Sequence, residues 1–169
     1  MKNYFTGKAE LLLRNLVFGV EDSLVSTTGL LSGVAMAGIS AGTIILTGTI
    51  LVFVEAFSMA VGSFLSEDVV HEYVIRDKNF YLASMVGGLV MFFSYFIAGY
   101  IPLIPYIFFP TIYAFWISIA AALMALFLLG AFSAEMFRAH YLRQGMKMFL
   151  VGGMAIAIGI LVGRLAGHI

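Results

Sequence analysis

The chain has 169 residues, of which 62% are apolar and only 11% are charged. A soluble domain of this length needs far more polar surface, so the composition predicts an integral membrane protein in a lipid bilayer. The formal net charge of zero gives no indication of a nucleic-acid partner, and the absence of Cys excludes disulfides and thiolate metal sites.

The amino-terminal region lacks the short apolar core and small-residue cleavage site of a signal peptide. Its first apolar segment contains Glu21 and Asp22, so we expect a helix of the mature protein. The uncharged run 23–54 is too long for one crossing, which needs about 20 residues. The segment GISAG at 38–42 predicts a turn within this run. The first two spans are therefore predicted at 15–37 and 43–65.

The run from Phe80 to Ala134 has no charge and holds three prolines near its centre. Proline removes a backbone donor and clashes inside a helix, so we expect the run to divide at Pro102, Pro105 and Pro110. The sequence thus predicts an all-α integral membrane protein with one transmembrane domain, residues 1–169. Its last three transmembrane helices are predicted at 80–100, 111–134 and 147–166, which makes five in total.

Basic residues flank the predicted spans unequally. Only Arg164 falls on one side, whereas the other side holds Lys2, Lys8, Arg14, Arg76, Lys78, Arg138, Arg143 and Lys147. Because Lys and Arg are retained in cytosolic loops, the amino terminus is predicted to be cytosolic and the carboxyl terminus outside. A short chain without a targeting extension favours a prokaryotic cytoplasmic membrane.

Three carboxylates, those of Glu21, Asp22 and Glu55, fall within the predicted spans. A charge at the bilayer centre costs about 2.5–3.5 kcal/mol on insertion scales, so these residues are functional candidates. At about 1.5 Å of rise per residue, two antiparallel helices bring Asp22, Met59 and Glu55 to similar depth. Two carboxylates and a thioether at one depth predict a metal site in a transport pathway. The alternatives are protonated acids that act as structural hydrogen-bond donors and a methionine that only fills the core.

Small residues accompany the acid of the first span. A stripe continues from Asp22 at steps of three and four residues through Ser26, Gly29, Gly33 and Met36. Small residues let a second helix approach closely, as in the Gly-x-x-x-Gly pattern of Gly29 and Gly33. We predict that this face is a helix-packing or dimer stripe, and packing without any transport role is the alternative.

Further acids lie where metal would arrive from the cytosol. Glu21 points about 100° away from Asp22 and is expected to face the cytosolic mouth or a basic partner. The connection after the second span holds Glu67, Asp68, His71 and Glu72. We predict that these five residues collect metal from the cytosol. The alternative for the connection is a solvated helix extension of mixed charge.

Several segments resemble the vacuolar iron transporter family. Residues 15–27 (NLVFGVEDSLVST) look like its first-helix signature, in which an aspartate follows a Phe-Gly pair. Residues 58–67 (SMAVGSFLSE) resemble its second-helix segment. Later helices are similar at 101–106 (IPLIPY), 126–131 (LFLLGA) and 151–155 (VGGMA).

The resemblance covers nearly the whole chain and implies five spans, a homodimer and proton-coupled export of Fe²⁺, with Mn²⁺ handled by some members. It maps Asp22 and Met59 onto the pathway aspartate and methionine of the family. Two departures stand out. Family members often have Gly where this chain has Ser23, whose hydroxyl would narrow or hydrate the path. Plant members have a long Glu-rich cytosolic metal-binding region, of which residues 66–79 are a short counterpart.

We therefore expect a secondary transporter and not an enzyme, since the chain has no nucleotide-binding motif and no hydrolytic constellation within a span. Carboxylate oxygens suit Fe²⁺ or Mn²⁺ as the transported ion, with no permanent cofactor. A low dielectric disfavours a charged carboxylate, so a proton can replace the metal and couple the two flows. The alternatives are a passive divalent-cation channel and a non-transporting membrane assembly or regulatory subunit.

Overall fold

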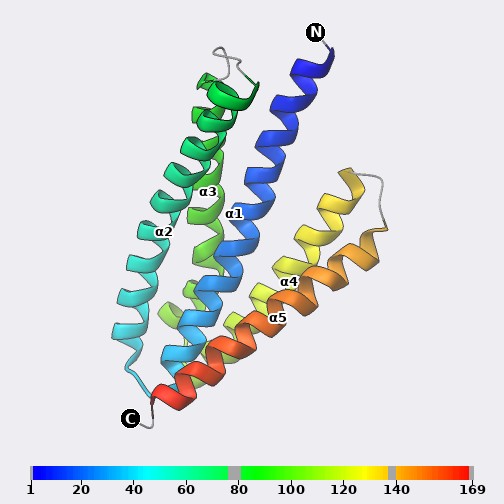
Figure 1. Ribbon diagram of the computed structural model, residues 1–169. Coiled ribbons are helices and arrows are strands. Elements are labelled where there is room, and N and C mark those ends of the chain that lie inside the picture. Colours follow the sequence, from blue (N-terminus) through cyan, green and yellow to red (C-terminus); the bar gives the residue numbers. More distant parts are fainter. Residues whose placement is uncertain (1, 76–80, 137–139, 168–169) are drawn as a thin grey trace.

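Five long helices and one π-helical segment form the protein in the computed structural model, which describes residues 2–75, 81–136 and 140–167. Consecutive long helices run antiparallel, so that α1 begins and α5 ends at opposite ends of the bundle (Figure 1). The predicted all-α architecture is confirmed. In chain order the elements are α1 (Lys2–Met36), α2 (Ala41–Val69), η1 (Val70–Ile75), α3 (Tyr81–Phe108), α4 (Thr111–Met136) and α5 (Tyr141–Ala166).

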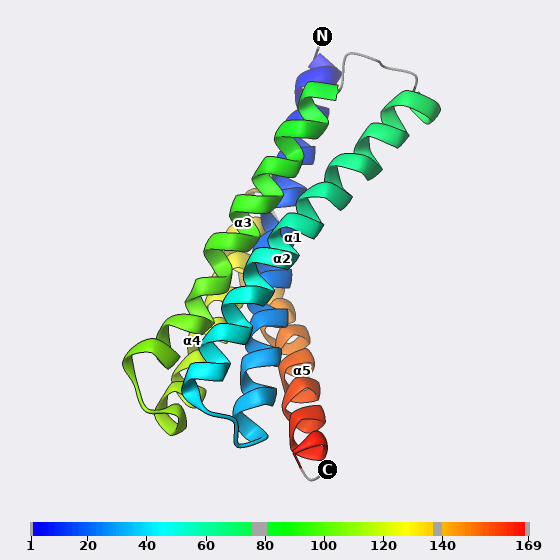
Figure 2. The ribbon, with the colours of Figure 1, turned by 90° about the vertical axis from the view of Figure 1, so that its left-hand side faces the viewer.

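Four helices of the described chain are long and apolar enough to cross a membrane: Ala41–Glu72, Tyr81–Phe108, Thr111–Glu135 and Tyr141–Ala166. The helix α1 is outside this set, since Glu21, Asp22 and the charges before them lower its apolar content. It nevertheless lies alongside α2 and α3 along the bundle (Figures 1 and 2). Large apolar side chains cover the outside, as expected of an integral membrane protein in contact with lipid.

The third helix differs from its prediction. Pro102 and Pro105 lie inside α3, which ends only at Phe108, so the predicted break at residue 100 is wrong. Membrane helices tolerate proline where neighbouring helices satisfy and cover the disturbed backbone. Here both prolines are buried, and the Ser118 hydroxyl of α4 donates to the Pro102 carbonyl at 2.8 Å. The break falls instead at Pro110, which precedes α4.

A tight turn joins α1 to α2 within the predicted segment 38–42. Gly38 has a φ of 77°, a left-handed conformation that glycine adopts without steric cost. Ser40 caps α2, because its side chain accepts a hydrogen bond from the Thr43 amide. The turn therefore brings the start of α2 back alongside the end of α1.

Replacing Gly38 by Ala should destabilise the protein by about 1–2 kcal/mol, because a left-handed backbone crowds a Cβ atom. The matched control is Gly42→Ala in the first turn of α2, where a Cβ would meet nothing within 4 Å. This control should be neutral or slightly stabilising. Thermal unfolding in detergent measures both, and equal losses in the two variants would contradict the role of the turn.

The helix α1 packs against all four other long helices and carries much of the buried polar surface. The backbones of α1 and α5 approach each other closely. A Cβ on Gly33 would lie 2.7 Å from the Gly159 carbonyl oxygen, and one on Gly159 would lie 2.6 Å from the Gly29 carbonyl oxygen. The glycines of the α1 stripe therefore let the backbone of α5 approach within the same chain.

Candidate metal pathway between helices α1, α2 and α3

Two carboxylates from antiparallel helices come close together in the middle of the bundle. Asp22 of α1 and Glu55 of α2 are both half-buried, and they lie near enough to interact electrostatically. Glu55 occupies the midpoint of α2, which runs from Ala41 to Val69. Both carboxylates are therefore far from the ends of their helices. A charge in such a position is costly unless it is paired or binds a cation.

A tyrosine of α3 contacts this pair and was missed by the sequence analysis. Tyr95 is completely buried, and its hydroxyl donates to the Glu55 carboxylate. The same hydroxyl lies 2.6 Å from the Ser26 hydroxyl of α1. Since the phenol has one proton, Ser26 must donate in the second bond. Side chains from three helices thus meet at the Tyr95 hydroxyl.

Ser23 has a different surrounding from the one expected. Its side chain is completely buried, and its hydroxyl donates to the Tyr95 carbonyl oxygen at 2.6 Å. A Cβ on Gly99, one turn along α3, would lie 2.9 Å from the same hydroxyl oxygen. The Ser23 hydroxyl therefore ties α1 to α3.

A groove of about 500 Å³ begins beside the Glu55 carboxylate. Ser26 and Glu55 line it together with α5, and it reaches Ile39 in the turn between α1 and α2. The stripe residues Gly29 and Gly33 form its floor on α1, while Met36 is exposed and lines a different hollow. The groove thus leads from the middle of the bundle to the end at which α2 begins.

Met59 is half-buried on α2, one helical turn from Glu55 toward the opposite end. Residues four apart share a face of a helix, so its thioether lies on the Glu55 side of α2. Of the three residues predicted as a metal site, Glu55 and Met59 are therefore one turn apart on α2, and Asp22 of α1 lies in electrostatic range of Glu55. In the part of the chain that the structure describes, no three His, Asp or Glu side chains are grouped closely enough to hold a metal ion.

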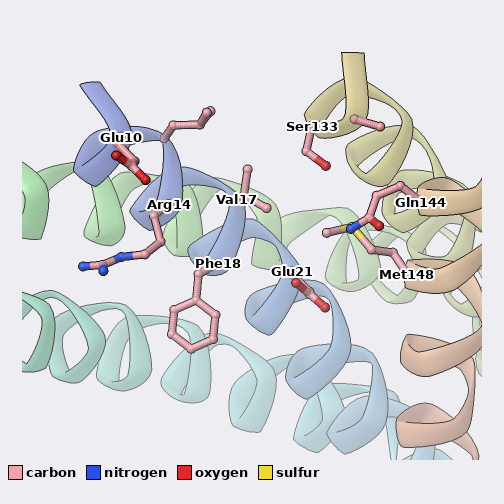
Figure 3. A pocket seen from close by; sticks show the side chains of 10 residues that line it. Glu10, Arg14, Val17, Phe18, Glu21, Ser133, Gln144 and Met148 are labelled. Carbon is pink, nitrogen blue, oxygen red and sulfur yellow. The ribbon is translucent and has the colours of Figure 1, made fainter. Parts of the chain in front are cut away.

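Glu21 lines a separate cleft of about 500 Å³ between α1, α4 and α5. Figure 3 shows its carboxylate beside Gln144 and Met148 of α5, with Glu10 further along α1. Lys147 of α5 also lies within electrostatic range of Glu21. At this end of the bundle α4 and α5 diverge from α1 (Figure 1).

The predicted acids after the second span lie on a continuous helical extension of α2 into η1. The Glu67 carboxylate pairs with Arg14 of α1 and lies 3.9 Å from the imidazole of His71. Asp68 is half-buried and Glu72 is exposed. Glu67 thus joins the end of α2 to the first half of α1, and Glu21 faces a different cleft. Of the residues used to predict orientation, Arg76, Lys78 and Arg138 lie outside the described residues.

Two overlapping stretches of the sequence, residues 13–79 and 69–164, match the model of the VIT family. The chain belongs to this family. The resemblance to vacuolar iron transporters is thereby confirmed, and the matched residues include Asp22, Glu55, Met59 and Tyr95. A search among curated proteins found no match. Membership of the VIT family indicates transport of a divalent metal ion by a protein that is not an enzyme.

Proposed function

We propose that this VIT family protein exports Fe²⁺ from the cytosol in exchange for protons, with Mn²⁺ as an alternative substrate, and that it works as a homodimer. The observation that carries the proposal is the pair of half-buried carboxylates of Asp22 and Glu55, which lie in electrostatic range of each other within the helix bundle. Two acids so placed repel each other, and a divalent cation between them relieves this repulsion. The homodimer rests on the resemblance to the family.

The chemistry of these side chains fits the proposed ion. Carboxylate oxygens bind Fe²⁺ and Mn²⁺ well, and the Met59 thioether adds a softer ligand that favours iron over manganese. A carboxylate must lose its proton before it binds a metal, so metal binding releases protons and proton binding releases metal. Exchange at Asp22 and Glu55 would therefore couple outward metal flow to inward proton flow.

The arrangement of the helices supports a direction. The start of α1 and the start of α5 lie at the same end of the bundle (Figure 1). That end carries Lys8, Arg14, Arg143 and Lys147, whereas Arg164 lies at the other end. By the positive-inside rule the basic end is cytosolic. Metal would then reach Asp22 and Glu55 from this end and leave through the groove that ends near Ile39.

Uptake into inverted membrane vesicles tests this function. We expect vesicles that contain the protein to accumulate Fe²⁺ and Mn²⁺ when the lumen is acidic, and Zn²⁺ much less. Collapse of the pH gradient with a protonophore should stop accumulation against a concentration gradient. Metal movement that is downhill only and indifferent to the protonophore would instead identify a passive channel, and no movement would favour a non-transporting membrane subunit.

A further inference from the structure

Tyr95 occupies the boundary between the two halves of the pathway. Asp22 lies on α1 one turn before Ser26, while Ser26 and Glu55 are the first residues of the groove that leads away. The Tyr95 hydroxyl contacts both Ser26 and Glu55. An ion moving along α1 from Asp22 into the groove must therefore pass the point where these three side chains meet.

The position of Tyr95 is fixed from both sides. Its backbone carbonyl accepts from Ser23 at 2.6 Å, which holds this turn of α3 against α1. One turn further along α3, a Cβ on Gly99 would lie 2.5 Å from Val52 of α2, so α2 and α3 are in close contact as well. The ring is completely buried. The hydroxyl therefore has little freedom and presents its single proton in one direction.

The carboxylate of Glu55 is held by a residue of another helix, Tyr95 of α3. This carboxylate accepts a hydrogen bond from the Tyr95 hydroxyl, and the Ser26 hydroxyl lies 2.6 Å from the same phenol oxygen. A glutamate side chain has three rotatable bonds, and fixing it without a partner costs conformational entropy. A donor that is already rigid lowers this cost and sets the direction of the carboxylate.

We propose that Tyr95 is the residue that positions Glu55 as a relay carboxylate, so that a divalent cation leaving Asp22 is received by Glu55 at the head of the α1–α2–α5 groove. This inference rests on the proposed function and adds to it an order of the two acids and a residue that controls the second. Tyr95 acts through Glu55 and does not itself bind the ion.

The test is Tyr95→Phe, which keeps the ring and removes only the hydroxyl. The half-saturating Mn²⁺ concentration in vesicle uptake should rise about 10-fold or more, because a hydrogen bond to a charged group is lost. Maximal velocity at saturating Mn²⁺ should change much less. The matched control is Tyr106→Phe, a tyrosine equally buried on α3 but packed in an apolar cluster with Leu31 and Leu103. It should leave the half-saturating concentration within about 2-fold of wild type.

A double-mutant cycle separates positioning from a purely structural role. In a Glu55→Gln background, Tyr95→Phe should add little to the loss already present, because the carboxylate it positions is gone. If Tyr95→Phe lowers the yield of folded protein, Glu55→Asp provides a second test. Its carboxylate is withdrawn from the phenol, so it should reproduce the increase in half-saturating Mn²⁺.

Mn²⁺ binding to the purified protein by calorimetry accompanies the transport assay. If the wild-type protein transports Mn²⁺ and Tyr95→Phe has the same half-saturating Mn²⁺ concentration, this inference is overturned and the proposed function stays in place. The same holds if Tyr95→Phe causes its full loss in the Glu55→Gln background. A wild-type protein that neither binds nor transports Mn²⁺ or Fe²⁺ overturns the proposed function and this inference with it.

Discussion

Replacement of Asp22 by Asn should lower metal transport by about 100-fold or more. The change keeps the size and shape of the side chain but removes the charge that attracts the ion and the oxygen that exchanges a proton for it. Loss of a residue that merely supports a metal ligand costs 10–100-fold in affinity, so the loss of a ligand should cost at least the upper part of this range. Initial rates of Fe²⁺ and Mn²⁺ uptake in proteoliposomes measure the effect.

The matched control for Asp22→Asn is Glu135→Gln. Glu135 is exposed near the end of α4 and lines none of the clefts described above. Its loss should leave transport within about 2-fold of wild type, since exposed surface changes are usually small. Equal transport by wild type and Asp22→Asn, at equal amounts of folded protein, would remove Asp22 from the mechanism.

Gly159→Ala should destabilise the protein by about 1–3 kcal/mol, the usual cost of overpacking. The new Cβ would lie 2.6 Å from the Gly29 carbonyl oxygen and 2.9 Å from the Gly29 Cα. Both are backbone atoms, which cannot rotate away as the end of a flexible side chain can. The helices α1 and α5 must therefore move apart. Both helices line the groove that begins at Glu55.

Gly153→Ala on the same helix is the control for this effect. Its Cβ would lie 3.5 Å from a Leu123 side-chain carbon, which is an ordinary van der Waals distance. Alanine is also the better helix former by about 1 kcal/mol, so this variant should be neutral or more stable. The midpoint of thermal unfolding in detergent should therefore fall for Gly159→Ala and stay equal or rise for Gly153→Ala. A loss in both variants would show that the close contact between α1 and α5 is not the cause.

The helical architecture and the two acids could be predicted from the sequence because both depend on local patterns. Long uncharged runs define membrane helices, and Gly38 and Ser40 mark the turn between α1 and α2. The helix α3 was predicted too short, because proline rules describe a helix in isolation. Pro102 and Pro105 are buried against neighbouring helices, and this packing outweighs the local cost.

The partners of the acids could not be predicted, because they depend on the rotation of helices far apart in the sequence. Tyr95 is one of eight tyrosines, and a buried tyrosine hydroxyl requires some partner without revealing which. Its bond to Glu55 spans 40 residues. In the same way, Glu67 was predicted to collect metal, but it pairs with Arg14 of a different helix. The packing of α1, α2 and α3 against one another determines these contacts.

Anomalous diffraction from crystals of the full chain grown with Mn²⁺ locates the bound ion directly. We expect an anomalous peak within coordination distance of the carboxylate oxygens of Asp22 or Glu55, and no such peak in crystals of Asp22→Asn. A peak confined to the Glu67–Glu72 region, with the space between Asp22 and Glu55 empty at a Mn²⁺ concentration that saturates transport, would contradict this expectation.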